Sequence, residues 1–192
     1  MRRKTFDGIL TAGGGLLTVV LIMAGALLMW GAVFTQSQVH SQLAAQKIYF
    51  PTAAAFAHAA PGTEITPGMK PYLLKYAGQQ VLTGAQAEAY ADHFIAVHLS
   101  EMPYHGVYSL ISTAARSATP GTTQAAQLSA LKTTAFQGTT LRGLLLEAYA
   151  YGTIGSIALV AAIVSFVLAA VSILLTLAGY VHWRRTSPAV QI

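Results

Sequence analysis

The sequence predicts an all-α membrane protein, in which two antiparallel transmembrane helices extend into an extracytoplasmic helical bundle. Three observations support this fold class. Two long stretches are apolar and free of charge, basic residues gather beside these stretches, and no segment shows the apolar/polar alternation of an exposed strand.

The composition is typical of a membrane protein. Hydrophobic residues make up 54% of the 192 residues and charged residues only 9%, whereas charged residues form about a quarter of an ordinary soluble domain. The absence of cysteine excludes disulfide bonds, thiolate metal sites and a cysteine nucleophile. Any folded part outside the membrane must therefore be stable through packing alone.

The first predicted transmembrane helix covers residues 8–34, where apolar sequence is nearly continuous. About 20 such residues cross a bilayer as a helix, so the stretch is long enough. A cleaved signal peptide is the alternative, because a basic start precedes the stretch and Ala24-Gly25-Ala26 resembles a cleavage site. The apolar sequence continues beyond that site to Phe34, and we therefore expect an uncleaved anchor.

The second predicted transmembrane helix covers residues 151–181. No charged residue occurs from Ala148 to Val181, and the part from Ile154 to Leu177 is rich in Ile, Leu, Val and Ala. Neither span holds an ionisable residue in its core, so the signature of pumps and charged-substrate pathways is missing. We do not expect a transporter or channel.

The positions of the basic residues predict the orientation in the membrane. The basic residues beside the spans are Arg2, Arg3, Lys4, Arg184 and Arg185. Such clusters face the cytoplasm, so we expect a multi-pass protein of the plasma (inner) membrane with both termini inside. The predicted parts are residues 1–7 (cytoplasmic), 8–34 (transmembrane), 35–150 (extracytoplasmic helical domain), 151–181 (transmembrane) and 182–192 (cytoplasmic). Because orientation explains the net charge of +5, no nucleic-acid partner is predicted.

Small residues recur at helical spacing in the second span, as in Ala161, Ser165 and Ala169. Small side chains allow helices to approach closely in lipid. One interpretation is a binding face for the helix of a partner protein. The other, which we favour, is that the two spans of this chain pack against each other.

The outer segment is predicted to be helical. The first helix continues past Phe34 until Pro51, because no breaker intervenes, and a Pro-rich loop with a short turn in residues 53–60 follows. Thr83 and Gln86 have the spacing of a capping box, which predicts a helix over residues 84–101 that stops before Pro103. On this helix Tyr90, Phe94 and Val97 form one stripe and are candidate interaction residues.

Two further helices are predicted over residues 104–117 and 123–136. A break at Gln137-Gly138 is expected next, with Thr139 or Thr140 capping a last helix that runs into the second span.

Few residues suggest chemistry. His98 and Glu101 share a helix face, and His105 follows beyond Pro103, so these side chains form a possible zinc site without the spacing of a known motif. Glu88 and Asp92 lie four residues apart and are better explained as a solvated face than as catalytic carboxylates. We predict no catalytic residue, metal or cofactor.

Residues 76–99 (YAGQQVLTGAQAEAYADHFIAVHL), residues 140–149 (TLRGLLLEAY) and the MRRKTFD start carry a resemblance to a family. The chain resembles, over most of its length, uncharacterised actinobacterial two-span membrane proteins. Some members of that family are labelled aromatic ring-opening dioxygenases, which implies an iron site made of two histidines and a carboxylate. His98, Glu101 and His105 are the only grouping of that kind here, and no functional residue is carried over.

These observations lead to two hypotheses. The first is a non-enzymatic accessory or scaffold subunit, embedded in the lipid bilayer, that docks to another membrane protein or forms a homo-oligomer. The alternative is an extracytoplasmic ligand-sensing module, which needs a separate signalling partner because the cytoplasmic ends are short.

Overall fold

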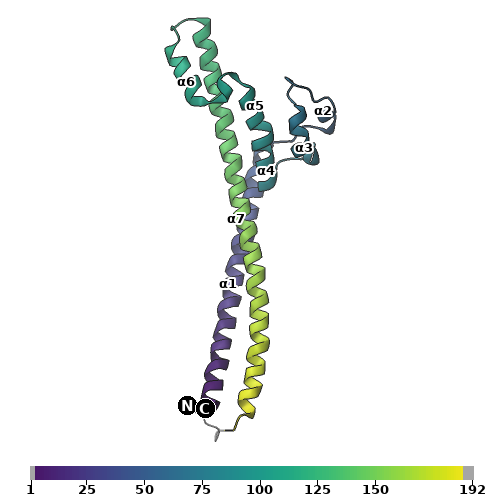
Figure 1. Cartoon of the computed structure of the whole chain (residues 1–192), viewed down its shortest axis with the longest axis vertical. Coiled ribbons are helices and arrows are strands. Elements are labelled where there is room, and N and C mark those ends of the chain that lie inside the picture. The colour runs from purple at the N-terminus through teal and green to yellow at the C-terminus, as the bar shows by residue number, and fades with distance from the viewer. Residues whose placement is uncertain (1–2, 188–192) are drawn as a thin grey trace. The chain divides into compact units, whose positions relative to one another are not determined.

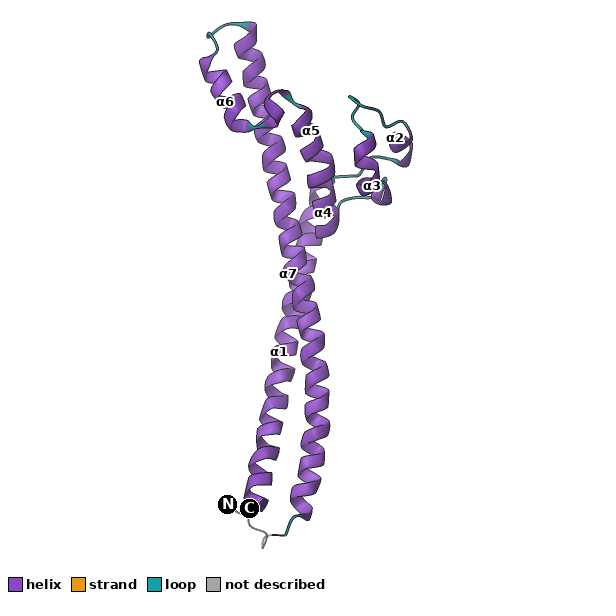
Figure 2. Cartoon of the chain, in the orientation of Figure 1, coloured by secondary structure: helices purple, strands orange, loops and turns teal. Residues whose placement is uncertain are grey.

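The computed structural model describes residues 3–187, and every regular element in this range is helical (Figure 1). Figure 2 shows the same chain coloured by secondary structure. The elements are α1 Arg3–Gln46, α2 Ala53–Ala57, η1 Pro67–Met69, α3 Lys70–Leu73, η2 Leu74–Tyr76, α4 Gly84–Tyr90, the π-helical η3 Ala91–Ile95, α5 Ala96–Glu101, η4 Pro103–Gly106, α6 Tyr108–Ser117 and α7 Thr123–Arg185. The predicted all-helical class is confirmed.

Two of these helices are long and apolar enough to cross a membrane. They are α1, with 44 residues, and α7, with 63 residues. The predicted spans 8–34 and 151–181 lie inside them. As predicted, α1 continues beyond Phe34, but it ends at Gln46 and not at Pro51, because Lys47 has a left-handed φ of 54°.

The chain divides into two compact units. Among the described residues, the apolar unit consists of residues 3–35 and 154–187, and the outer unit consists of residues 36–153. Arg2 of the predicted basic cluster and residues 188–192 of the predicted C-terminal segment lie outside the described residues.

Small and hydroxyl side chains hold the two helices of the apolar unit together. The hydroxyl of Thr18 donates to the hydroxyl of Ser172 at 2.9 Å, and the hydroxyl of Ser165 donates to the backbone carbonyl of Leu21 at 2.9 Å. Small side chains permit this close approach of the two helices. The two spans therefore pack on each other, which is the interpretation that the sequence favoured.

The outer unit has its own hydrophobic core. Residues of α1, of the segment from Phe50 to Val81, of α4 with η3, and of α7 contribute to it. The buried apolar side chains are Val39, Leu43, Phe50, Phe56, Ile65, Met69, Leu73, Val81, Ala87, Ala89, Ala91, Ile95 and Leu145. Since the chain has no disulfide, burial of these groups is the main source of this unit's stability.

The helical stretch over residues 84–101 is confirmed, together with its N-terminal capping box. The Thr83 side chain accepts from the Gln86 amide at 3.3 Å, and the Gln86 side chain accepts from the Thr83 amide at 3.1 Å. The stretch ends at Glu101, before Pro103. Its middle, Ala91–Ile95, is a π-helical turn, which the sequence did not predict.

The helix predicted over residues 104–117 begins later than expected, at Tyr108. Tyr104 and His105 have φ angles of 58° and 53°, and Gly106 has a φ of 66°. These left-handed conformations interrupt a right-handed helix, and for residues with a Cβ they are strained. The turn places Gly106 against the Leu99 backbone.

The predicted break at Gln137-Gly138 is wrong, because α7 runs through it without interruption, and Thr139 and Thr140 cap nothing. Gly138 has a packing role instead. A Cβ at this position would lie 2.8 Å from the Leu99 Cδ2 atom. The glycine therefore makes room for a neighbouring side chain and does not end the helix.

Candidate functional site

The structure places the predicted stripe of Tyr90, Phe94 and Val97 against the core of the outer unit, where these side chains are partly buried. The Tyr90 ring lies 5.4 Å from the Phe50 ring, edge to face, and 4.7 Å from the Phe94 ring. Aromatic pairs at these distances stabilise a core beyond the area that they bury. Contacts within the chain thus account for the packing of this stripe.

The phenol of Tyr90 has a raised pKa. Burial raises the pKa of Tyr90 above its ordinary value of 10.0, and the negative charge of the Glu64 carboxylate raises it further. Both causes favour the neutral phenol in the folded protein.

We expect the Tyr90→Phe variant to lose less stability at alkaline pH than the unmodified chain. In the unfolded chain the phenol ionises near pH 10, whereas in the folded chain it stays neutral to higher pH. Its contribution to stability is therefore complete below pH 10 and is lost as the pH rises through the folded-state pKa. Unfolding in detergent at a series of pH values above neutrality tests this. Tyr49→Phe, at an exposed position, is the control, and identical pH profiles for the two variants contradict the prediction.

The structure does not bring the possible zinc ligands together. The Nδ1 atom of His98 lies 2.7 Å from the Phe94 carbonyl oxygen, so this ring is engaged with its own helix. Glu101 and His105 are exposed. Within residues 3–187 no group of three or more His, Asp or Glu side chains has a geometry that could hold a metal ion.

Asp92 forms an ion pair with Arg142. The Arg142 Nη2 atom donates to the Asp92 Oδ1 atom at 2.6 Å, and the side chains are 40% and 35% exposed, respectively. The Arg142 Nε atom is buried and has no hydrogen-bond partner. The pair links the π-helical turn to α7, and at this exposure it contributes about 1 kcal/mol or less.

In the second span, the predicted face of Ala161, Ser165 and Ala169 points towards the first span. Ser165 and Ala169 are buried and Ala161 is partly buried. A Cβ on Gly25 would lie 2.9 Å from the Phe166 ring, so Gly25 is also used in this packing.

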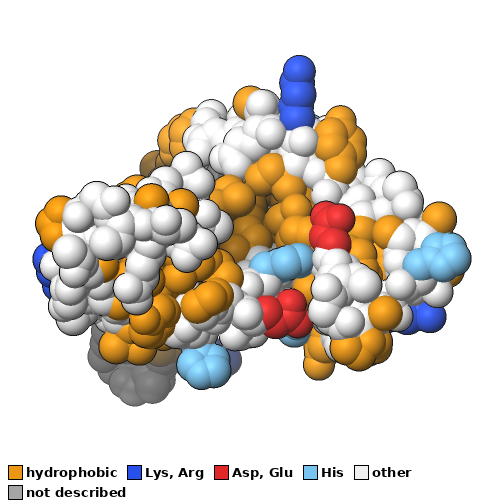
Figure 3. All heavy atoms as spheres, turned by 90° about the horizontal axis from the view of Figure 1, so that it is seen from above, with side chains coloured by type: hydrophobic (Ala, Val, Ile, Leu, Met, Phe, Trp, Pro, Cys, Tyr) orange, Lys and Arg blue, Asp and Glu red, His pale blue; other side chains and the backbone are white. Residues whose placement is uncertain are grey.

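Large apolar side chains are exposed in the outer unit, around the start of α6. We name Tyr104, Val107, Tyr108 and Phe136 the outer aromatic patch. Each is more than two-fifths exposed, and Phe136 is 56% exposed. The rings of Tyr108 and Phe136 lie 5.8 Å apart, and the Val107 amide donates to the Tyr104 carbonyl at 3.1 Å, so the four residues are neighbours. Figure 3 shows hydrophobic side chains on the face in view, with acidic and histidine side chains beside those at its centre.

Sequence reasoning missed this patch. On α7, Leu128 and Leu131 are partly buried and Ala135 is buried, and the three residues lie on one side of the helix. Phe136 follows directly after Ala135 and therefore points about 100° away from that side. The position of Phe136 outside the apolar stripe of its helix could have indicated an exposed aromatic residue.

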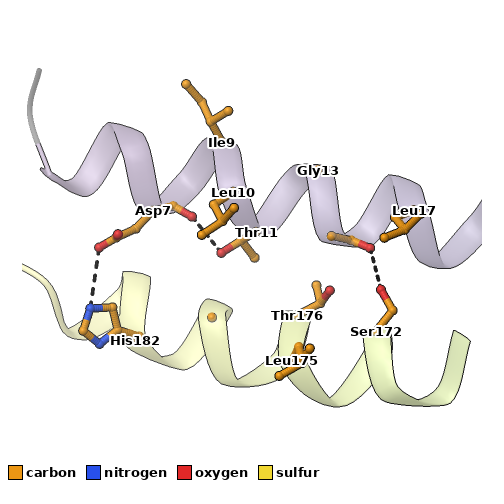
Figure 4. A pocket seen from close by; sticks show the side chains of 12 residues that line it. Asp7, Ile9, Leu10, Thr11, Gly13, Leu17, Ser172, Leu175, Thr176 and His182 are labelled. Carbon is orange, nitrogen blue, oxygen red and sulfur yellow. Dashed lines mark hydrogen bonds and ion pairs between the residues drawn. The ribbon is translucent and has the colours of Figure 1, made fainter. Parts of the chain in front are cut away.

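A groove lies between the two helices of the apolar unit (Figure 4). Its volume is about 610 Å³. The lining residues are Asp7, Ile9, Leu10, Thr11, Gly13, Gly14 and Leu17 of α1 and Ser172, Leu175, Thr176, Gly179 and His182 of α7. Glycines and short side chains leave this space unfilled, because they supply little volume between the two backbones.

Polar groups close one end of the groove. The Asp7 side chain, 15% exposed, has its Oδ2 atom 3.7 Å from the His182 Nε2 atom. The Thr186 hydroxyl donates to the same oxygen at 3.3 Å. Figure 4 shows Asp7 and His182 facing each other across the two helices.

Comparison with protein-family models, with curated proteins and with solved structures finds no match to the chain. The resemblance to actinobacterial two-span membrane proteins therefore stays a prediction.

Proposed function

We propose that this chain is a non-enzymatic accessory or scaffold subunit of the plasma (inner) membrane. In this proposal α1 and α7 cross the bilayer as an antiparallel pair, both termini are cytoplasmic, and the outer unit is extracytoplasmic. The apolar helices and the basic residues at their ends support this arrangement. Its partner is another membrane protein or a second copy of the chain.

The outer aromatic patch is the observation that carries the docking role. A contiguous patch of exposed apolar side chains outside a membrane often marks a surface that binds another protein. Aromatic residues are also the commonest binding hot spots of protein interfaces. Because the stripe of Tyr90, Phe94 and Val97 and the small-residue face of the second span are used within the chain, the patch is the better docking surface.

The strained turn next to the patch supports the same proposal. Tyr104 and His105 both have left-handed backbone conformations. Such strain costs about 1–3 kcal/mol per residue and persists where the surroundings enforce it, often at functional sites. In this chain it holds Tyr104 beside Val107, where a partner can contact both.

A cysteine introduced beside the patch tests both the orientation and the docking role. Thr133 is exposed and lies three residues before Phe136 on α7, and the chain has no other cysteine. In intact cells the Thr133→Cys variant should react with a membrane-impermeant maleimide. After modification with a benzophenone maleimide and illumination, it should form a crosslinked product of discrete mass.

The mass of that product identifies the partner. Twice the mass of the chain indicates a second copy, and any other discrete mass indicates another membrane protein. The exposed control position Lys70→Cys, on α3, should give no such product. Adding Tyr108→Ser with Phe136→Ser should abolish the crosslink, whereas adding Tyr49→Ser should not. No labelling in intact cells overturns the orientation, and equal crosslinking from Lys70→Cys overturns the docking role.

A further inference from the structure

The groove of the apolar unit is lined mainly by apolar side chains and glycines, and hydroxyl groups line part of it. The Thr11 hydroxyl donates to the Asp7 carbonyl at 2.8 Å, and the Ser172 hydroxyl donates to the Gly14 carbonyl at 3.2 Å. These two hydroxyls are therefore already engaged with the backbone of α1. The side chains of Leu10, Leu17 and Leu175 supply apolar parts of the wall.

The polar end of the groove lies close to a cluster of positive charges. The described cations at this end of the two helices are Arg3, Lys4, Arg184 and Arg185. The carboxylate near these cations is that of Asp7, which already contacts His182 and accepts a hydrogen bond from Thr186. Within residues 3–187 none of the four cations forms an ion pair with a carboxylate. A negatively charged group at this end would find a strongly favourable potential.

We propose that the groove binds one acyl chain of an anionic phospholipid, whose phosphate is held by Arg3, Lys4, Arg184 and Arg185. The apolar wall matches the acyl chain. Arg184 lies over the Tyr180 ring, but within residues 3–187 no carboxylate neutralises the four cations, so they match an anionic headgroup. This inference rests on the proposed membrane location of α1 and α7. It does not depend on the docking role of the outer aromatic patch.

Replacing one glycine of α1 by leucine should block the groove, and the same replacement at a second glycine is the matched control. A Cβ on Gly13 or on Gly15 would have no atom within 4 Å, so a side chain can begin at either position without meeting a neighbour. Gly13 lines the groove, whereas Gly15 is not among its lining residues. Gly13→Leu therefore fills the groove, and Gly15→Leu adds the same apolar side chain elsewhere on α1.

The two tryptophans of the chain serve as reporters. Trp183 follows His182 at the polar end of the groove, and its Nε1 atom lies 3.1 Å from the position of a Cβ on Gly8. Trp30 is exposed on α1 and lies within the first predicted span. Trp30→Phe leaves Trp183 as the fluorophore, and Trp183→Phe leaves Trp30.

The experiment measures quenching of each tryptophan in phosphatidylcholine vesicles that contain a minor fraction of brominated lipid. We expect brominated phosphatidylglycerol to quench Trp183 more strongly than brominated phosphatidylcholine does, with an apparent preference of about fivefold or more. Gly13→Leu should remove the preference, and Gly15→Leu should retain it. Trp30 should be quenched equally by both lipids.

Other quenching results would contradict either the lipid site or the membrane location. Equal quenching of Trp183 by the two lipids, or equal behaviour of Gly13→Leu and Gly15→Leu, overturns the lipid site. A Gly13→Leu variant that changes the oligomeric state but keeps the lipid preference also overturns it, and indicates that a second copy occupies the groove. If neither brominated lipid quenches Trp30, the membrane location itself is wrong.

Discussion

Replacement of Gly84 by leucine is expected to lower the free energy of unfolding of the outer unit by about 3 kcal/mol, the upper part of the usual range for overpacking. Gly84 is the buried first residue of α4. A Cβ there would lie 3.1 Å from the Ala148 carbonyl oxygen and 3.1 Å from the Tyr149 Cα atom. Both atoms belong to the backbone of α7, which cannot move aside as a side chain can. A leucine would therefore push α4 away from α7.

The loss should spread through the core, because Ala87 of α4 and Leu145 of α7 are both buried in it. Gly143→Leu is the matched control, since a Cβ at this exposed position on α7 has no atom within 4 Å. It should be neutral or slightly stabilising, as leucine favours a helix more than glycine does. Unfolding in detergent, followed by the near-ultraviolet circular dichroism of the tyrosines, compares the two variants. Equal effects of Gly84→Leu and Gly143→Leu would show that α4 and α7 do not meet closely.

The helices of this chain could be predicted from the sequence where a single physical constraint determines them. A stretch without charge that is long enough to cross a bilayer leaves few alternatives, so both long apolar helices were predicted from sequence. The start of α4 was predictable because a capping box satisfies backbone amides through residues three positions apart. In both cases the determining residues lie close together in the sequence.

The errors come from contacts between residues that are distant in the sequence. Gly138 has the sequence signature of a helix end, but its role is to admit the Leu99 side chain. The left-handed turn at Tyr104 and His105 has no local signal, because these residues normally avoid positive φ. Tertiary packing decides both cases, and the position of the packing partner cannot be read from the local sequence.

The same limit applies to the candidate sites. The stripe of Tyr90, Phe94 and Val97 has the periodicity of a binding face and also of a core face, and only the positions of neighbours such as Phe50 distinguish the two. The groove requires the register between two helices that are far apart in sequence. The residues that line it are unremarkable in isolation, since glycine, leucine and threonine are common in any membrane helix.

Replacement of Gly106 by alanine is expected to have the second large effect, and it bears directly on the outer aromatic patch. Gly106 has a φ of 66°, and a Cβ at this position would lie 2.4 Å from the Leu99 carbonyl oxygen. The substitution therefore adds an atomic overlap with backbone to the strain of the left-handed conformation. We expect a loss of about 3 kcal/mol or more in the free energy of unfolding, of which about 1–2 kcal/mol is the conformational part.

Gly121→Ala separates these two contributions. Gly121 has a φ of 78°, and a Cβ there would have no atom within 4 Å, so alanine should bring the conformational strain alone. If Gly106→Ala costs no more than Gly121→Ala in the same detergent unfolding experiment, the close approach to Leu99 is absent. The turn also holds Tyr104 beside Val107, so Gly106→Ala should weaken crosslinking from Thr133→Cys, whereas Gly121→Ala should not. Loss of stability without loss of crosslinking would separate the turn from the patch and leave the strain without a role in docking.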